Sequence, residues 1–264
     1  MPRTDLAIPG EHAAVSASGA GIGRRIARAL AEAGVDVALN DVDAEALADA
    51  EAALADCPGA VTGVAGDVSD PDVAASLIED AVGAFGGLDI LVNNVGIAGP
   101  TEPAEEISHE AFMRTLEVNL GGHFNAARAA IPHLAEGPGG RMVNLSSMSG
   151  KRPLRDRTPY TTAKMGVIGL TRTLAVELAD RGVTVNAVCP GAVSGPRMDA
   201  VIEAQAEERG RSFEAVEREF RELSPMGEFV EAGDVADAVL YLCSERARRV
   251  TGQDLNVTAG VTMY

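Results

Sequence analysis

A glycine-rich turn near the start of the chain, A-S-G-A-G-I-G at residues 17–23, separates an apolar segment from an amphipathic one. Residues 13–16 have the composition of a short buried strand, whereas Ile22, Ile26 and Leu30 recur at helical spacing. A strand that passes through glycines into a helix N-terminus forms a cradle for phosphate. Backbone amides can approach the anion there, and the helix dipole favours negative charge. The turn therefore indicates an α/β fold that binds a phosphorylated ligand.

The rest of the chain repeats the alternation of strand and helix. The pattern predicts strands at 35–39, 61–65, 88–92, 141–145, 183–188 and 254–257, and helices at 44–54, 71–85, 109–134, about 160–181 and 234–243. This order calls for a parallel sheet covered on both faces. We expect an α/β fold with a single Rossmann-type doubly wound parallel sheet of about seven strands and helices on both faces. The expected domain spans 1–264, with a substrate lid inserted at about 195–225.

Tyr160 and Lys164 are four residues apart, which places both side chains on one face of a helix. A tyrosine with a pKa near ~10 is a poor base at neutral pH, but a nearby cation stabilises its phenolate form. Lys151 and Lys164 are the two lysines among the 22 basic residues, so lysine at position 164 differs from the arginine used elsewhere. The pair predicts a proton-transfer site, with a surface pair as the alternative interpretation.

Asp41 follows the predicted strand at 35–39. An acid at the end of the second strand can accept hydrogen bonds from both ribose hydroxyls of an adenosine and would repel a 2′-phosphate. This position favours NAD over NADP. The alternative is that Asp41 caps the helix that begins near Asp43.

The formal net charge of −17 argues against nucleic acid or an anionic membrane as a partner, because both require a basic surface. The chain contains no apolar run of the ~20 residues needed to cross a bilayer, and its first residues lack a signal-peptide core. We therefore expect a cytoplasmic protein. Cys57, Cys189 and Cys243 lack metal-ligand spacing, so we expect buried thiols and no metal site.

The loop between the serine pair and Tyr160 is basic, with Lys151, Arg152, Arg155 and Arg157. Such a cluster in an acidic protein predicts recognition of an anionic substrate, and surface salt bridges explain it equally well. The candidate substrate residues are Arg152 and Arg155 of this cluster, together with Ser149, which we expect to be a pocket or backbone-capping residue.

These motifs together resemble the short-chain dehydrogenase/reductase family, and the resemblance covers essentially the whole chain. The matching segments, in chain order, are V-S-A-S-G-A-G-I-G, D-V at 67–68, N-N-V-G, Asn119, N-L-S-S, Y-T-T-A-K, V-N-A-V-C-P-G and T-G-Q-D-L-N-V-T-A-G.

The resemblance implies four catalytic residues. Tyr160 would be the acid/base, Lys164 would stabilise its phenolate and bind the nicotinamide ribose, and Asn119 would hold a water in a proton relay. The family commonly places its serine about 13 residues before the tyrosine, and 160 − 13 = 147, which favours Ser147 over Ser146.

The resemblance also implies a cofactor site and a homotetramer built on the helices around the catalytic residues and on the C-terminal strand. Asp67 and Val68 would meet the adenine, and Pro190, Gly191 and Val193 would border the nicotinamide. The expected cofactor-binding residues are Ser16, Ser18, Gly21, Ile22, Gly23, Asp41, Asp67, Val68, Asn93, Val95, Gly96, Tyr160, Lys164, Pro190, Gly191 and Val193.

The chain departs from the family pattern at four positions. Ala17 replaces the first glycine of the turn, so we expect either a negative φ at this residue or a shift of the loop that Gly19 absorbs. Val95 replaces an alanine, Gly195 stands where a threonine usually follows the P-G pair, and Ala259 replaces a glycine of the tail. None of these changes removes a group that takes part in the chemistry.

The predicted function is an NAD-dependent oxidoreductase that interconverts a secondary alcohol and a ketone, with Tyr160 as acid/base. One alternative is an NADPH-dependent 3-oxoacyl carrier-protein reductase, against which Asp41 weighs. The other is a non-catalytic dinucleotide-binding sensor. Sensors typically lose the tyrosine or the lysine, and this chain retains both.

Overall fold

The computed structural model describes residues 6–137 and 139–264; residues 1–5, part of the N-terminal segment without a signal-peptide pattern, lie outside it. A seven-stranded sheet has the order β3-β2-β1-β4-β5-β6-β7, and each neighbouring pair is parallel. This confirms the predicted α/β fold. The strands are β1 (His12–Val15), β2 (Asp36–Asp41), β3 (Val61–Ala65), β4 (Ile90–Asn93), β5 (Arg141–Leu145), β6 (Thr184–Pro190) and β7 (Asp254–Val257).

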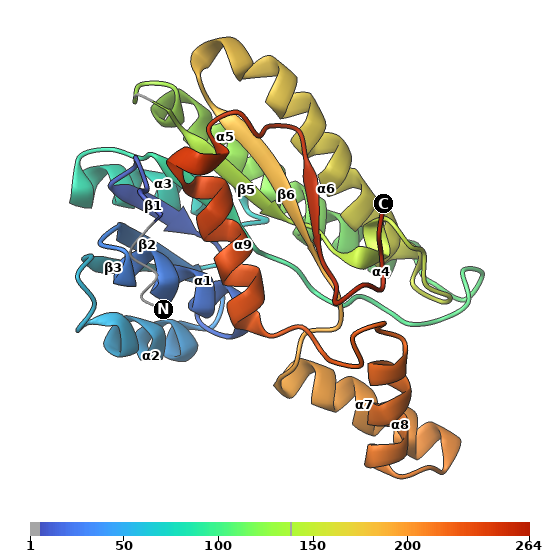
Figure 1. Cartoon of the computed structure of the whole chain (residues 1–264). Coiled ribbons are helices and arrows are strands. Elements are labelled where there is room, and N and C mark those ends of the chain that lie inside the picture. Colours follow the sequence, from blue (N-terminus) through green and yellow to red (C-terminus); the bar gives the residue numbers. More distant parts are fainter. Residues whose placement is uncertain (1–5, 138) are drawn as a thin grey trace.

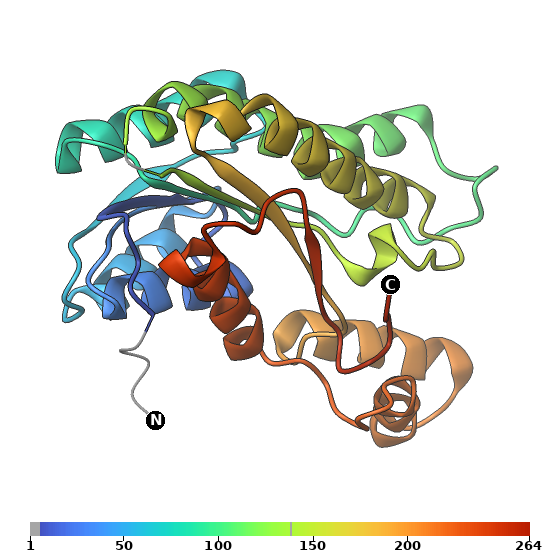
Figure 2. The ribbon, with the colours of Figure 1, turned by 45° about the horizontal axis from the view of Figure 1, so that its top comes forward.

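Helices cover both faces of the sheet (Figures 1 and 2). One layer contains α1, α2 and α9, and the other contains α3, α5 and α6 with α4 beside α6. The helices are α1 (Gly21–Glu32), α2 (Ala44–Leu54), α3 (Pro71–Phe85), α4 (His109–Leu116), α5 (Gly122–Leu134), α6 (Thr158–Glu177), α7 (Pro196–Arg209), α8 (Phe213–Glu222) and α9 (Ala232–Cys243).

The central strand β1 shows how the sheet separates two apolar cores. Ala13 and Val15 point towards α1 and α9 and belong to one buried cluster. Ala14 points the other way and belongs to the cluster formed with α3, α5 and α6. Because both faces are covered, the strand is apolar at every one of these positions instead of alternating. The two cores hold the strands in place. Because all strands run in the same direction, the loops that follow them lie on one edge of the sheet.

Local capping explains why the predicted bounds of α2 and α3 coincide with the observed ones. The Asp43 carboxylate accepts hydrogen bonds from the backbone N–H groups of Glu45 and Ala46, and Asp70 caps α3 in the same way. Gly86 ends α3 in the left-handed conformation, with φ of 90°. These signals are local in sequence and could therefore be identified without the fold.

Two predicted helices are interrupted or shorter in the structure, and α9 begins at Ala232, two residues before its predicted start. The helix expected at 109–134 is interrupted by a π-helical turn, Glu117–Gly121, which contains Asn119. The Asn119 side-chain amide donates to the Thr115 carbonyl at 2.9 Å, so this polar contact accompanies the irregular turn. The helix expected to reach 181 ends at Glu177, and a separate 3₁₀ turn, Ala179–Arg181, follows.

The predicted lid region forms a helical hairpin, α7 and α8, which projects beyond the edge of the sheet (Figure 1). Ile202 and Val216 are fully buried between the two helices, with Phe213, Phe220 and Phe229 packed against them. The hairpin therefore has a small apolar core of its own.

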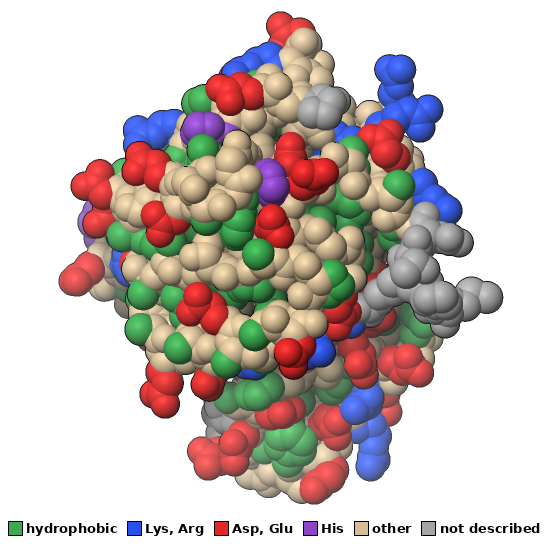
Figure 3. All heavy atoms as spheres, turned by 90° about the vertical axis from the view of Figure 1, so that its left-hand side faces the viewer, with side chains coloured by type: hydrophobic (Ala, Val, Ile, Leu, Met, Phe, Trp, Pro, Cys, Tyr) green, Lys and Arg blue, Asp and Glu red, His purple; other side chains and the backbone are tan. Residues whose placement is uncertain are grey.

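Acidic side chains are spread over the face of the molecule shown in Figure 3. Within residues 6–137 and 139–264, no helix is long and apolar enough to cross a membrane. The same residues contain no cluster of three or more His, Cys, Asp or Glu side chains suited to a metal ion. Cys189 and Cys243 are buried as expected, whereas Cys57 is half-buried.

Candidate active site

The Tyr160–Lys164 pair lies on the first turns of α6, beside the end of β5. Lys164 is 4% exposed, and its Nζ donates to the Leu145 carbonyl at 2.8 Å. The same Nζ is 5.9 Å from the centre of the Tyr160 ring. Ser146 Oγ donates to the Lys164 carbonyl at 2.8 Å, so two hydrogen bonds connect the end of β5 to Lys164 of α6. A buried ammonium is thereby fixed next to a half-buried phenol.

Ser147 follows directly and begins a 3₁₀ turn, Met148–Gly150. Its Oγ accepts a hydrogen bond from the backbone N–H of Ser149 at 3.1 Å. A hydroxyl that accepts one bond can still donate its own hydrogen. The Ser146 hydroxyl donates its hydrogen to Lys164 instead. The structure therefore gives the two serines different hydrogen-bonding roles, and Ser149 lies buried behind them.

Asn119 approaches the same place from the π turn. Its Nδ2 donates to the carbonyls of Ile97 and Thr115, at 3.1 and 2.9 Å, while its buried Oδ1 has no hydrogen-bond partner among the described residues. A Cβ added to Gly96 would lie 2.5 Å from Asn119 Oδ1 and 3.3 Å from Lys164 Nζ. Gly96 thus marks the point where the two side chains converge. A buried acceptor of this kind suits an ordered water.

The N-terminus of α1 fits the phosphate cradle predicted for it. Its N-cap residue, Ala20, makes no side-chain capping bond, and the first turn carries no acidic residue. Gly21 has φ of 54°, and an added Cβ would meet no described atom within 4 Å. At Gly23, by contrast, a Cβ would lie 2.1 Å from the Ala17 carbonyl oxygen. The turn is therefore closely packed at Gly23, against the Ala17 carbonyl, and open at Gly21.

Ala17 adopts φ of 49°, so the expected negative φ is wrong. Ala259, which also replaces a family glycine, has φ of 48°. Both residues keep the left-handed backbone that a glycine would adopt more readily. The surrounding structure imposes the conformation: Asn94 Nδ2 donates to the Ala17 carbonyl at 2.8 Å.

Asp41 closes the cradle from the end of β2. Its Oδ2 accepts from the Gly19 backbone N–H at 2.9 Å, and its Oδ1 accepts from the Asp43 N–H at 3.1 Å. Asp43, not Asp41, caps α2. The helix-capping alternative for Asp41 is therefore excluded, and its carboxylate lies against the glycine-rich turn.

Asp67, after β3, forms an ion pair with Arg114 of α4 at 2.5 Å. Partial burial by itself would raise the pKa of Asp67, but hydrogen bonds from Arg114 and Ser69 outweigh it and hold that pKa below its usual value. The neighbouring Val68 is buried. The carboxylate therefore stays charged and is tied to the helix layer.

Several other predicted cofactor residues hold the backbone of the site. Ser16 Oγ accepts from the Asn94 and Val95 N–H groups, at 3.0 and 3.3 Å, and Ser18 Oγ donates to the Val15 carbonyl at 3.0 Å. Asn93 Nδ2 donates to Asn144 Oδ1 at 2.9 Å, which joins β4 to β5. The remaining predicted residues lie at the same edge or next to it: Ile22, Gly191 and Val193 are half-buried, and Pro190 and Val95 are buried.

The basic loop does not form one cluster. Lys151 Nζ pairs with Asp254 of β7 at 2.7 Å. Arg155 is 92% exposed and lies 3.5 Å from Asp156, and Arg152 is exposed. Arg157 lies over the Tyr160 ring, with its Cζ 4.7 Å from the ring centre. The structure thus brings one of the four cations, Arg157, onto the predicted acid/base.

His123, in the first turn of α5, is a buried residue that the sequence analysis did not select. Its Nε2 lies 3.1 Å from the Val95 carbonyl oxygen. Burial, together with the nearby charge of Lys164, lowers the pKa of His123 to about 3. The available signal was a histidine four residues after Asn119 on an apolar helix face, and a core histidine gives the same pattern.

A parallel doubly wound sheet with a glycine-rich first turn and ligand loops at the strand ends is typical of dinucleotide-dependent oxidoreductases. A family model described as "Enoyl-(Acyl carrier protein) reductase" matches residues 16–262. The chain belongs to the short-chain dehydrogenase/reductase family and is an oxidoreductase.

Two curated relatives show how widely the substrates of similar proteins differ. The D-beta-hydroxybutyrate dehydrogenase of Rhizobium meliloti (strain 1021) is 36% identical over 255 residues, which cover 95% of this chain and 98% of the relative. The 3beta-hydroxysteroid dehydrogenase 1 of Eggerthella lenta is 38% identical over 259 residues, which cover 97% and 95%.

Two solved structures differ in their nicotinamide cofactor. A NAD⁺-bound xylitol dehydrogenase has a TM-score of 0.90 and 28% identity, with 96% of this chain and 99% of that chain covered. An actinorhodin polyketide ketoreductase with NADPH has a TM-score of 0.92 and 33% identity, with 98% and 100% covered. The comparisons thus indicate a nicotinamide dinucleotide as the class of cofactor.

Proposed function

We propose that this protein is an NAD-dependent oxidoreductase that interconverts a secondary alcohol and a ketone, with Tyr160 as the acid/base. The observation that carries the proposal is the convergence at Gly96, where Asn119 Oδ1 and Lys164 Nζ meet the same small volume. Lys164 in turn lies 5.9 Å from the Tyr160 ring centre. Three predicted catalytic side chains, one from the π turn and two from α6, are therefore gathered near the carboxyl end of β5.

The residues around the glycine-rich turn fit a dinucleotide. The uncapped N-terminus of α1, open in front of Gly21, would hold the pyrophosphate through backbone N–H groups and the helix dipole. Asp41 would accept hydrogen bonds from the adenosine ribose, and its charge would repel a 2′-phosphate. Bound NAD supplies the hydride acceptor for alcohol oxidation and, when reduced, the hydride donor for ketone reduction.

Side chains of the protein would transfer the proton of the substrate hydroxyl. In the oxidation direction, the Tyr160 phenolate takes the proton of the substrate hydroxyl, and the Lys164 ammonium stabilises that phenolate. Ser147 Oγ donates a hydrogen bond to the substrate oxygen. Because Leu145 holds Lys164 Nζ at 2.8 Å, the cation keeps its place during the transfer. A water on Asn119 Oδ1 would pass the proton onward.

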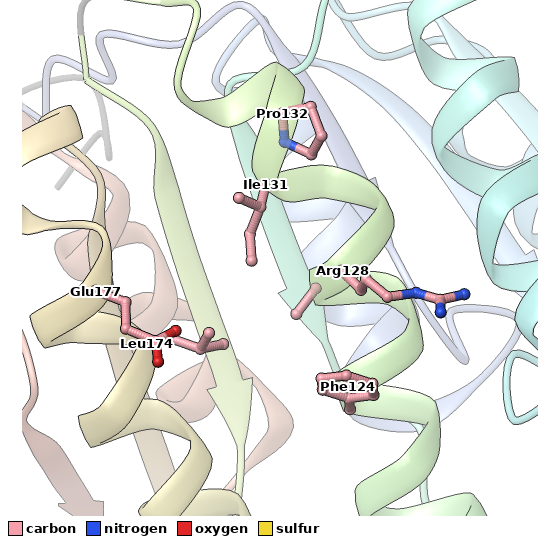
Figure 4. Close-up of a pocket in the computed structure, with 7 residues that line it drawn as sticks. Phe124, Arg128, Ile131, Pro132, Leu174 and Glu177 are labelled. Carbon is pink, nitrogen blue, oxygen red and sulfur yellow. The ribbon is translucent and has the colours of Figure 1, made fainter.

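We propose a homotetramer in the cytoplasm as the working form, with α5 and α6 in one interface. A groove of about 280 Å³ lies between these helices, lined by Phe124 and Ile131 of α5 and Leu174 of α6 (Figure 4). Phe124 is 48% exposed and Val176 of α6 is 80% exposed. A second copy of the chain would cover these apolar side chains. Light scattering on the purified protein tests the assembly, and a monomer at micromolar concentration would refute it.

The decisive experiment is calorimetric binding of NAD and NADP, followed by turnover of secondary alcohols at alkaline pH. We expect tighter binding of NAD, turnover of at least one alcohol, and loss of nearly all turnover in Tyr160→Phe with NAD binding retained. Preference for NADP would favour the carrier-protein reductase. Tight NAD binding without turnover of any alcohol would favour the sensor, and substantial activity of Tyr160→Phe would exclude Tyr160 as the acid/base.

A further inference from the structure

Arg157 occupies a position that helix stability does not explain. It is the N-cap residue of α6, and its side chain makes no capping hydrogen bond. Asp43, Asp70, Ser108 and Ser212 cap α2, α3, α4 and α8 with side-chain oxygens. A cation at a helix N-terminus also faces the positive end of the helix dipole, which is unfavourable. A residue that breaks two local rules beside a catalytic side chain indicates a functional role.

The side chain of Arg157 is instead directed at the active site. Its guanidinium carbon lies 4.7 Å from the Tyr160 ring centre, and its Nη1 donates to Thr101 Oγ1 at 2.8 Å. The Glu102 N–H donates to the Asp156 carbonyl at 3.0 Å, so the loop that carries Thr101 is tied to the loop that carries Arg157. The guanidinium is therefore held over the phenol ring before any substrate binds.

The other basic side chains of this loop have different positions. Lys151 is 10% exposed and pairs with Asp254, which Arg172 also contacts at 2.6 Å. Arg155 is almost fully exposed next to Asp156. Arg152 is exposed as well, so the loop cation for which the structure shows a contact with the Tyr160 ring is Arg157.

We propose that Arg157 binds a carboxylate of the substrate, so that the substrate is a small secondary alcohol that carries a carboxylate a few bonds from its carbinol. This inference rests on the proposed function, because the position of the carbinol follows from Tyr160 as the acid/base. A planar guanidinium matches a carboxylate with two parallel hydrogen bonds. Its hold on Thr101 reduces the entropy lost on binding. The name of the Rhizobium relative describes an alcohol of this class.

The test compares 3-hydroxybutyrate with its uncharged methyl ester as substrates of the wild type and of Arg157→Gln. We expect the wild type to prefer the acid in kcat/KM. Arg157→Gln should lower kcat/KM for the acid by about 10- to 100-fold, mostly through KM, and change it less than about threefold for the ester. Arg157→Lys should recover part of the loss. Both substrates use the same Tyr160. Damage to this acid/base would therefore lower kcat/KM for the acid and for the ester alike, and the ratio of the two values would not change.

Arg155→Gln is the matched control, since it removes an exposed cation of the same loop, and we expect an unchanged ratio. Three outcomes would overturn the carboxylate site while leaving the alcohol chemistry intact. The wild type could turn over acid and ester equally, or Arg157→Gln could lose activity equally towards both. The third outcome is faster reduction of acetoacetyl-CoA than of acetoacetate. Absence of turnover with every substrate would overturn the proposed function, and the carboxylate site with it.

Discussion

Lys164 Nζ lies 5.9 Å from the centre of the Tyr160 ring and is anchored by a 2.8 Å hydrogen bond to the Leu145 carbonyl. The anchor comes from β5, so the charge next to the phenol depends on the packing of α6 against the strand end. The helix alone provides the spacing of the two residues, and the strand provides the position of the cation.

The first prediction concerns this cation. Lys164→Met removes the charge but keeps an unbranched side chain. We expect kcat to fall by about 10²- to 10⁴-fold, the usual contribution of acid–base catalysis, because the phenolate has lost its nearby charge. Steady-state kinetics of the two proteins measure this loss. An unchanged kcat would exclude Lys164 from phenolate stabilisation.

Gly96→Ala tests the convergence of Asn119 and Lys164. The new Cβ would lie 2.5 Å from Asn119 Oδ1, so the side chain, the loop or both must move. We expect a loss of activity of at least about tenfold and a cost in folding stability of about 1–3 kcal/mol, which is usual for overpacking. Steady-state kinetics and urea unfolding measure the two effects. Gly83→Ala on α3, where a Cβ would meet no described atom within 4 Å, is the control and should be stabilising or neutral.

Asp41→Ala tests the choice of cofactor. Removing the carboxylate removes the repulsion of a 2′-phosphate and also the hydrogen bond to the Gly19 N–H. We expect NAD binding to weaken and the NADP to NAD affinity ratio to rise by about 10- to 100-fold. Calorimetric titration with both nucleotides gives this ratio. If the ratio does not change, Asp41 does not select the cofactor.

Ala17→Gly should stabilise the protein, in contrast to most alanine-to-glycine changes. Ala17 has φ of 49°, a conformation that costs an alanine about 1–2 kcal/mol. The added flexibility of the unfolded chain offsets part of this gain, so we expect a net stabilisation of about 1 kcal/mol. Ala20→Gly, at φ of −146°, is the control and should be neutral or destabilising. Denaturant unfolding distinguishes the two.

His123 predicts the acid sensitivity of the fold. Burial and the charge of Lys164 lower its pKa to about 3, compared with about 6.5 in the unfolded chain. Below pH 6.5, His123 therefore binds a proton in the unfolded state but stays neutral in the folded state until the pH approaches 3. The resulting stability is complete above pH 6.5 and is lost as the pH falls towards 3, at up to about 1.4 kcal/mol per pH unit.

His123→Leu should remove this contribution. Between pH 7.5 and pH 5, the variant should lose about 2 kcal/mol less of its free energy of unfolding than the wild type does, because 6.5 − 5 = 1.5 pH units separate pH 5 from the unfolded pKa. The loss of the contact with the Val95 carbonyl shifts stability at every pH and does not affect this difference. Parallel curves for the two proteins would contradict the assigned pKa.

The two helices that begin at an aspartate cap, α2 and α3, were predicted closely, whereas the helix break set by a distant contact was not predicted. The predicted bounds of α2 and α3 agree with the structure because Asp43 and Asp70 mark their starts in the sequence itself. The break of the helix at Asn119 depends partly on the Ile97 carbonyl, which lies 22 residues away. A helix-period pattern contains no information about that acceptor.

The basic loop shows the same limit at the site. The sequence grouped Lys151 with Arg157, but Lys151 pairs with Asp254 of β7, which is 103 residues later. Arg157 reaches Tyr160 because α6 begins there and the loop of Thr101 supports its side chain. Which cation contacts Tyr160 follows from the packing of three chain segments and not from their order.

The sequence by itself determined the parallel sheet, the order of its elements and the residue types at the strand ends. Hydrophobic periodicity, glycine turns and caps act over a few residues, so they can be identified along the chain. Tertiary structure decided that Ala17 keeps a left-handed backbone, that Asn119 and Lys164 both approach Gly96, and that Arg157 lies over the Tyr160 ring. Each of these depends on contacts between segments that are distant in sequence, and their free energy is gained only when the sheet brings those segments together.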